Sequence, residues 1–225
     1  PVTTTDELIP SGETSSYRSN PLGLAEFTLS RKDPEYVGRA KAIQAAQTAL
    51  MNGKCPGESC PELELKRVFD AISRSFPEFP EVVAASYSTG DDALKARSLG
   101  FGSTIFAVKP GDGSAREQAA SCQKVLGGWA NIANEYATKR YRSNLINWGM
   151  LPFLIEEGQL PFKNLDYLFI PNIRKAVEEK ADTIQAYKVD VEKKELLGFT
   201  LRLGELTDEE RQIILKGCLI NYNRV

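Results

Sequence analysis

The segment from Gly111 to Gln118 combines small residues, a serine and an arginine where an apolar strand is expected to turn into a helix. Small residues let the backbone approach a ligand closely, and the first N–H groups of a helix have no partners inside it. An anion is therefore favoured at this place. Arg116, in the first turn, can grip a carboxylate through two hydrogen bonds. If Ser114 acts as a base, the same donors would stabilise its alkoxide.

The same serine also has a structural interpretation. Ser114 and Glu117 fit the capping-box pattern S-x-x-E, in which the serine hydroxyl accepts a hydrogen bond from the N–H three residues later. A capping serine holds the end of a helix and needs no role in chemistry. The spacing alone leaves both interpretations open.

The composition limits the chemistry that this chain can complete by itself. Its 225 residues include no histidine, so neither a Ser-His-Asp nor a Cys-His arrangement can form within it. Lys and Arg number 28 against 30 Asp and Glu, and the net charge of −2 gives no basic excess for nucleic-acid binding. No run of 18 apolar residues is present, so we expect no membrane-spanning helix.

The four cysteines do not form a metal-binding pattern. Cys55 and Cys60 flank a loop-like stretch, whereas Cys122 and Cys218 lie in separate apolar helical patterns. Without histidine, and without a second pair at ligand spacing, we expect no zinc or iron–sulfur site made by this chain alone. The thiols are interpreted as reduced, in a cytoplasmic protein.

Alternating strand and helix patterns must position the serine-containing segment. A short apolar run over residues 103–108 predicts a buried strand before it, and a helical pattern ending near Gly127 follows it. Farther along, the sequence predicts strands at 129–133, 167–170, 183–191 and 196–203, and helices at 137–148, at 173–180 and after Thr207, which forms a capping box with Glu210.

The N-terminal half is predicted to begin as a loop and to continue as helices. Residues 1–30 are rich in Thr, Ser, Gly, Asn and Pro, which indicates a loop followed by a short strand near 25–29. Apolar residues then recur at helical spacing over 33–53 and 61–76. The mixture predicts an α/β fold in a single domain, 1–225, with residues 33–100 as a helical insertion.

The segment Gly113–Ala120 resembles the G-S-S-R-E-H-A signature of the aconitase family. Upstream, Thr4–Pro10 resembles the T-T-D-H-I segment that opens the family's C-terminal swivel domain. Arg18 lies twelve residues after Asp6, the spacing of a substrate-binding arginine in the family. The order of the family's G-G, F-A, N-L and G-L-L-P landmarks is also kept, in Gly127-Gly128, Tyr136-Ala137, Asn144-Leu145 and Gly149-Met150-Leu151-Pro152.

The resemblance implies a three-layer β/β/α swivel domain that closes over an active site. In the family, other domains or a separate large subunit hold a [4Fe-4S] cluster that binds the substrate, so no metal ligand is expected in this chain. By position, Ser114 would be the base, and Arg18 and Arg116 would bind substrate carboxylates. Ala115 occupies the substrate-binding place of the second serine, and Asp6 would help to order the site.

Two departures from the signature bear on the substrate. Ala115 lacks the hydroxyl of the second serine, and Gln118 replaces the histidine. A lost hydrogen bond to a charged carboxylate costs about 1.5–3 kcal/mol of recognition, so citrate itself is disfavoured. We therefore predict the swivel domain of a hydro-lyase that dehydrates and rehydrates a hydroxy di- or tricarboxylic acid.

The sequence also leaves two alternatives open. One is a stand-alone small subunit of an isopropylmalate-isomerase-like enzyme. The other is a non-catalytic module that binds an anion or RNA through Arg18, Arg116, Arg140 and Arg142, against which the net charge of −2 argues. The start at Pro1 favours a domain excised from a longer chain, and we expect the isolated domain to be inactive. In the catalytic interpretation Arg142 has a structural role.

Overall fold

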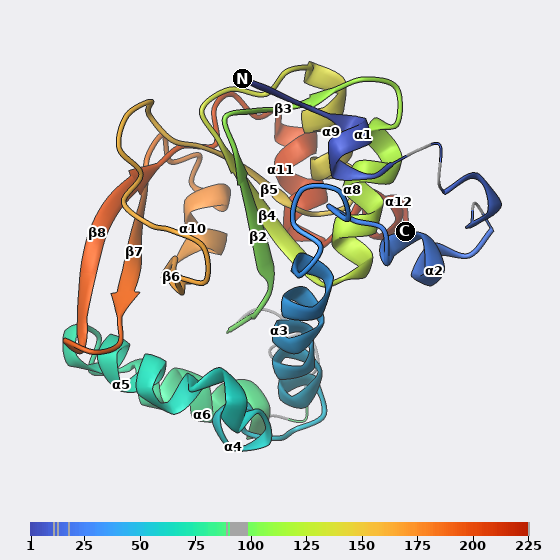
Figure 1. The fold of residues 1–225 in the computed structure, drawn as a ribbon. Helices are drawn as coiled ribbons and strands as arrows, with labels where there is room; N and C mark the ends of the chain where they lie inside the picture. The colour runs from blue at the N-terminus through green and yellow to red at the C-terminus, as the bar shows by residue number, and fades with distance from the viewer. Residues whose placement is uncertain (11, 13, 18, 89, 91–98, 225) are drawn as a thin grey trace. The chain divides into compact units, whose positions relative to one another are not determined.

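The computed structural model of the chain describes residues 1–10, 12, 14–17, 19–88, 90 and 99–224. The chain forms two compact units (Figure 1). Unit 1 comprises Pro1–Lys41, Gly102–Glu157 and Arg202–Val225, and unit 2 comprises Ala42–Phe101 and Gly158–Leu201. The interpretation of the chain as one domain with an insertion at 33–100 stays a prediction. Unit 2 contains most of residues 33–100 together with the later segment Gly158–Leu201.

Unit 1 contains two parallel sheets. The larger has the strand order β2-β4-β5, and the smaller pairs β1 with β3. Since β1 and β3 run in the same direction, the segments that leave them begin at the same end of that sheet. The strands are β1 (Val2–Thr4), β2 (Ser103–Ala107), β3 (Lys109–Asp112), β4 (Gly128–Ala133) and β5 (Leu151–Leu154).

Two longer helices of unit 1, α8 (Arg116–Val125) and α9 (Lys139–Asn147), pack against each other. Tyr141, Leu145 and Met150 are completely buried in the core that these helices share. Complete burial of a leucine side chain contributes about 1.5–3 kcal/mol to stability. The other helical segments that lie wholly in unit 1 are α1 (Thr5–Leu8), η1 (Ser15–Tyr17), α2 (Pro21–Ala25), α11 (Asp208–Leu215) and α12 (Leu219–Asn223).

Unit 2 combines an antiparallel sheet, of order β6-β7-β8, with helices. Aromatic rings fill its core, and the ring centroids of Phe76 and Phe169 lie 5.2 Å apart in an edge-on contact. Helix α3 (Tyr36–Met51) begins in unit 1 and continues into unit 2. The other elements are α4 (Pro56–Ser59), η2 (Pro61–Leu63), α5 (Leu65–Ser75), α6 (Phe79–Ser88), β6 (Leu168–Phe169), α10 (Ile173–Glu178), β7 (Ile184–Asp190) and β8 (Glu195–Leu201).

The predicted α/β class and most of the predicted elements are confirmed. The strand at 103–107, the helices on either side of β4, and the strands predicted at 183–191 and 196–203 are all observed, the last two as β7 and β8, which pair with each other. Thr207 and Glu210 form the predicted capping box of α11. In the described part of the chain, no helix is both long and apolar enough to cross a membrane.

The predicted strand at 25–29 is wrong. Pro21 begins the short helix α2, and the Asn20 side chain accepts a hydrogen bond from the Gly23 N–H at 3.0 Å. Asparagine before a first-turn proline favours a helix start, and turns follow this helix. Helix α6 was not predicted because Pro80 reads as a helix breaker, although proline is tolerated in a first turn.

Candidate active site

Two segments that the sequence singles out, Thr4–Asp6 and Gly111–Arg116, meet in unit 1. Strands β1 and β3 pair in parallel, with Thr4 opposite Asp112. Gly113 has φ +129°, and a Cβ at this position would overlap with the Thr5 hydroxyl oxygen. The start of α1 therefore lies against the turn that carries Ser114.

The other side of the turn rests on α9. Gly111 has φ +103°, and a Cβ there would overlap with the Tyr141 ring. The Thr138 hydroxyl donates to the Gly111 carbonyl oxygen at 3.2 Å, and Asn131 Nδ2 donates to the Tyr141 hydroxyl at 2.8 Å. Burial raises the pKa of Tyr141, so its hydroxyl stays neutral. These contacts fix the backbone that leads to Ser114.

Ser114 does not cap α8. The residue at the N-cap position is Ala115, and no side-chain hydrogen bond caps the helix from there. Ser114 is exposed, and within the described chain no hydrogen bond involves its hydroxyl. The capping interpretation of Ser114 is therefore wrong, and the hydroxyl is available at the open end of the helix.

Arg116 begins α8, two residues after the serine. Its Nε atom is buried and makes no hydrogen bond with any residue that the structure describes. A buried guanidinium donor without an acceptor is unfavourable, and a bound carboxylate would satisfy it. Arg116 thus has the chemistry expected of a carboxylate-binding residue, beside an exposed serine hydroxyl.

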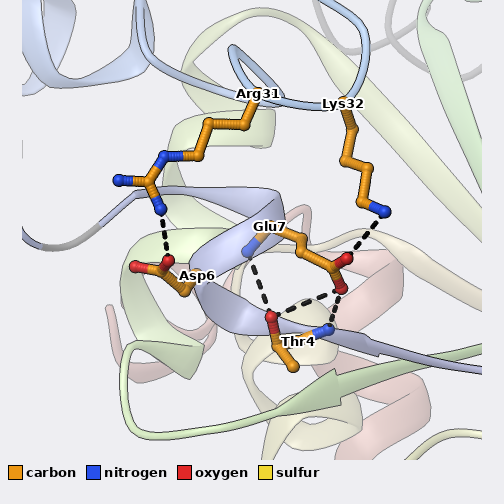
Figure 2. Close-up of polar contacts among 5 residues, drawn as sticks. All are labelled: Thr4, Asp6, Glu7, Arg31 and Lys32. Carbon is orange, nitrogen blue, oxygen red and sulfur yellow. Dashed lines mark hydrogen bonds and ion pairs between the residues drawn. The ribbon is translucent and has the colours of Figure 1, made fainter.

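Asp6 lies in α1, which a network of polar contacts holds (Figure 2). Asp6 is half-exposed and pairs with Arg31 at 2.6 Å, while Glu7 pairs with Lys32 at 2.7 Å. The Thr4 N–H donates to Glu7 Oε2 at 2.7 Å, and the Glu7 N–H donates to Thr4 Oγ1 at 3.2 Å. Hydrogen bonds from Lys32, first, and from the Thr4 N–H lower the pKa of Glu7.

Sequence reasoning missed this closed capping box at the start of α1. The signal was available, because Thr4-Thr5-Asp6-Glu7 has the T-x-x-E spacing. The contact of Asp6 with Arg31 ties α1 to the loop that follows α2. The predicted role of Asp6 in ordering the site stays a prediction.

The arginines of the other motifs divide into two cases. Arg18 lies outside the residues that the structure describes, so its role stays a prediction. Arg142 donates to the carbonyl oxygens of Leu203 at 3.2 Å and Glu205 at 2.7 Å, and its guanidinium lies 3.8 Å from Glu210. These contacts give Arg142 the structural role expected of it and occupy it within the fold, which argues against the anion- or RNA-binding module.

The four cysteines are the candidate ligands for an iron–sulfur cluster in this chain. Cys60 and Cys122 are buried, Cys55 and Cys218 are partly buried, and all four are free thiols. Burial raises the pKa of Cys122 to about 11, which disfavours the thiolate that binds metals. The described residues contain no group of three or more Cys, Asp or Glu side chains that could hold a metal ion.

Residues 98–158 match the family model of the aconitase C-terminal domain. The matched range contains β2 to β5, the Ser114 turn, α8 and α9. The match confirms the resemblance to the swivel domain of the aconitase family over this part of the chain.

Among solved structures, the chain is similar to 3-isopropylmalate dehydratase (leuD) from Methanocaldococcus jannaschii. The two sequences are 18% identical, the match covers 98% of this chain and 89% of that chain, and the TM-score is 0.44. The comparison with curated proteins gives no match.

Proposed function

We propose that this chain is the swivel domain of an aconitase-family hydro-lyase that acts on a hydroxy di- or tricarboxylic acid. The observation that carries the proposal is the turn between β3 and α8, which presents an uncapped Ser114 hydroxyl beside Arg116 at an open helix N-terminus. The family match over residues 98–158 supports it.

Ser114 is the proposed base. Its alkoxide removes a proton from the carbon next to the one that bears the leaving hydroxyl, the electrons of the broken C–H bond form the carbon–carbon double bond, and the hydroxyl leaves as hydroxide. This hydroxide and the proton taken up by Ser114 together make up the one water that is lost. In the reverse direction the Ser114 hydroxyl returns the proton to that carbon. The N-terminus of a helix carries a partial positive charge of about +0.5, which stabilises an anion on Ser114.

Arg116 and Ala115 are the proposed substrate contacts beside the base. Arg116 binds a substrate carboxylate, because its buried Nε offers a hydrogen bond that no described residue accepts. Ala115 presents a methyl group where the family's signature has a hydroxyl, which disfavours citrate. Arg18 and Asp6 complete the proposed set, as a second carboxylate ligand and as an ordering residue.

The proposal includes a partner. A [4Fe-4S] cluster belongs to other domains of the same polypeptide or to a separate large subunit, and it supplies the Lewis acid that holds the substrate hydroxyl. The isolated chain then has no turnover. A cytoplasmic location and reduced thiols belong to the same proposal.

The test is reconstitution with the cluster-bearing part, followed by assays of hydroxy di- and tricarboxylates. We expect Ser114→Ala to lower turnover by about 10²–10⁴-fold, as loss of a general base does, with the substrate still bound. Ser121→Ala is the matched control, since Ser121 lies in α8, the helix that follows Ser114, and its hydroxyl donates to the Gln118 carbonyl oxygen at 3.3 Å. Full turnover of the Ser114→Ala enzyme would refute the assignment.

A further inference from the structure

Three segments of unit 1 have the capping-box spacing, but only two of them form the box. In α1, Thr4 and Glu7 exchange both hydrogen bonds, and at α11 Thr207 and Glu210 do the same, at 2.8 and 3.1 Å. At α8, Ser114 and Glu117 exchange neither, and the helix starts at Arg116 without a side-chain cap from its own segment. The Glu117 N–H and the Glu117 carboxylate are therefore not bonded to Ser114.

Asn144 of α9 and Trp148, which directly follows the last residue of α9, make the two hydrogen bonds that Glu117 would make in a box. The Asn144 amide, oriented so that both of its neighbours are satisfied, accepts a hydrogen bond from the Glu117 N–H at 2.8 Å and donates to the Arg140 carbonyl oxygen at 3.1 Å. The Trp148 indole N–H donates to Glu117 Oε1 at 2.7 Å. In a capping box these two groups of Glu117 would bond to the hydroxyl and the N–H of Ser114.

The geometry of α9 explains why the two residues act together. Asn144 and Trp148 are four residues apart, at the C-terminal end of this helix, so they lie on one face. Helices α8 and α9 pack closely, and this face meets the first turn of α8. Each replaces one contact of the same missing box, so the position of Glu117 is set from α9.

The position of the Glu117 carboxylate matters for the proposed base. A closed box would hold this negative charge against the backbone of Ser114, where it would oppose formation of an alkoxide. It would also bind the Ser114 hydroxyl to the Glu117 N–H, as in a helix cap, so the hydroxyl would not be free to act as a base. The hydrogen bond from Trp148 to the carboxylate removes the first obstacle, and the hydrogen bond from the Glu117 N–H to Asn144 removes the second.

We propose that Asn144 and Trp148 are positioning residues, which hold Glu117 away from Ser114 and so keep the serine hydroxyl free for proton transfer. The proposal rests on the proposed function of Ser114. Neither residue touches the substrate in this proposal, and both act on the site through Glu117.

The first experiment needs no activity and uses thermal unfolding of the full chain. We expect Ser114→Ala alone to leave the unfolding midpoint within about 1 °C, because Ser114 caps nothing. In the Asn144→Ala background, Ser114 becomes the cap, and Ser114→Ala then lowers the midpoint by about a further 2–4 °C. Asn147→Ala is the matched control, since Asn147 lies on the same helix and within the described chain its side chain makes no hydrogen bond. An equal effect of Ser114→Ala in both backgrounds overturns the replacement of the cap.

The second experiment uses the reconstituted enzyme and the pH dependence of kcat. Trp148→Phe keeps an aromatic side chain, smaller than the indole, and removes the N–H, so the Glu117 carboxylate is released toward Ser114. We expect kcat to fall about tenfold. The rise of kcat with increasing pH, which reports deprotonation of the base, should move by about one pH unit to higher pH. KM should stay within about twofold, because Arg116 is untouched. Adding Glu117→Gln to Trp148→Phe removes the charge and restores kcat.

The outcomes separate the two proposals. If Ser114→Ala keeps full turnover, the proposed function fails and the role of α9 in catalysis fails with it, while the unfolding cycle still decides which residue caps α8. If Ser114→Ala is inactive but Trp148→Phe keeps the wild-type pH profile, only the positioning role is overturned. A loss in Trp148→Phe that Glu117→Gln does not restore also overturns it, because a general disturbance of packing would behave that way.

Discussion

Helices α1 and α8 begin at the same end of the small sheet in unit 1, and both are preceded by a hydroxyl residue three places before a glutamate. At α1 the pair Thr4 and Glu7 closes into a capping box, and at α8 the pair Ser114 and Glu117 stays open. The difference comes from the neighbours, because Lys32 binds only the second Glu7 oxygen while Asn144 and Trp148 occupy the corresponding groups of Glu117. A local pattern thus predicts a local contact only where no packed element competes for it.

The comparison has a functional side. The closed end of α1 uses its hydroxyl for stability, whereas at α8 Ser114 is exposed, two residues before Arg116, whose buried Nε has no hydrogen-bond partner among the described residues. A helix start without a cap from its own segment forgoes up to about 0.5–2 kcal/mol of stability, and at α8 the Asn144 side chain supplies one of the missing hydrogen bonds. Natural proteins give up stability of this size most often where a site needs the free group.

The largest expected effect comes from closing the space between the two helix starts. Gly113→Ala places a Cβ against the Thr5 hydroxyl in a residue whose φ is +129°, so both overlap and backbone strain oppose it. We expect the free energy of unfolding to fall by about 3 kcal/mol, measured by urea denaturation. Gly38→Ala is the control, because Gly38 lies in the first turn of α3 and nothing lies within 4 Å of the Cβ that the substitution adds. We expect it to leave the free energy of unfolding unchanged or to raise it by up to about 0.5 kcal/mol. A loss below about 0.5 kcal/mol for Gly113→Ala would show that α1 and the turn are not in contact.

How far the sequence predicts this arrangement depends on the range of the interactions. Helices α8 and α9 and the hairpin of β7 and β8 follow from periodicity, because their apolar residues recur over many positions. The capping box of Thr207 and Glu210 is also local and was predicted correctly. The approach of Thr4–Asp6 to the Ser114 turn follows only from the family resemblance, since more than 100 residues separate the two segments.

The failures are non-local or too short to carry a pattern. Strand β1 has three residues and owes its conformation to pairing with β3, so no alternation marks it. The S-x-x-E pattern at Ser114 misleads because the competing Asn144 lies 27 residues beyond Glu117. Pro80 suggests a break where the structure has the helix α6. A proline in the first turn does not break a helix, whereas one in its interior does.

A smaller effect distinguishes the two helix starts directly. Thr4→Ala removes the hydroxyl that accepts from the Glu7 N–H, and we expect it to lower the free energy of unfolding by about 1 kcal/mol. Ser114→Ala removes the hydroxyl at the corresponding place of α8 and is expected to change stability by less than about 0.5 kcal/mol. Urea denaturation of both variants beside the wild type measures the difference. Equal losses would mean that Ser114 caps α8 in solution, and the contrast between the two helix starts would disappear.

The smallest expected effect is a pH dependence that belongs to α1 alone. The Lys32 ammonium and the Thr4 N–H hold the pKa of Glu7 below its ordinary value of 4.5. Because the lowered pKa belongs to the folded state, Glu7 binds a proton more readily in the unfolded chain. The contribution of Glu7 to the free energy of unfolding is therefore fully present above pH 4.5. That contribution is lost as the pH falls through the lowered pKa of the folded state.

Glu7→Gln should therefore be less stable than the wild type at neutral pH, and the difference should shrink as the pH falls below 4.5. Glu117→Gln serves as the comparison at α8, where the carboxylate accepts from the neutral Trp148 N–H instead of pairing with an ammonium group. The measurement is the free energy of unfolding of both variants and the wild type from pH 3 to pH 7, at low salt so that the ion pair with Lys32 is not screened. The exposure of this pair keeps the expected difference small. A Glu7→Gln difference that is constant across this range would mean that the carboxylate of Glu7 is not held by charge, and that α1 is closed by the hydroxyl of Thr4 alone.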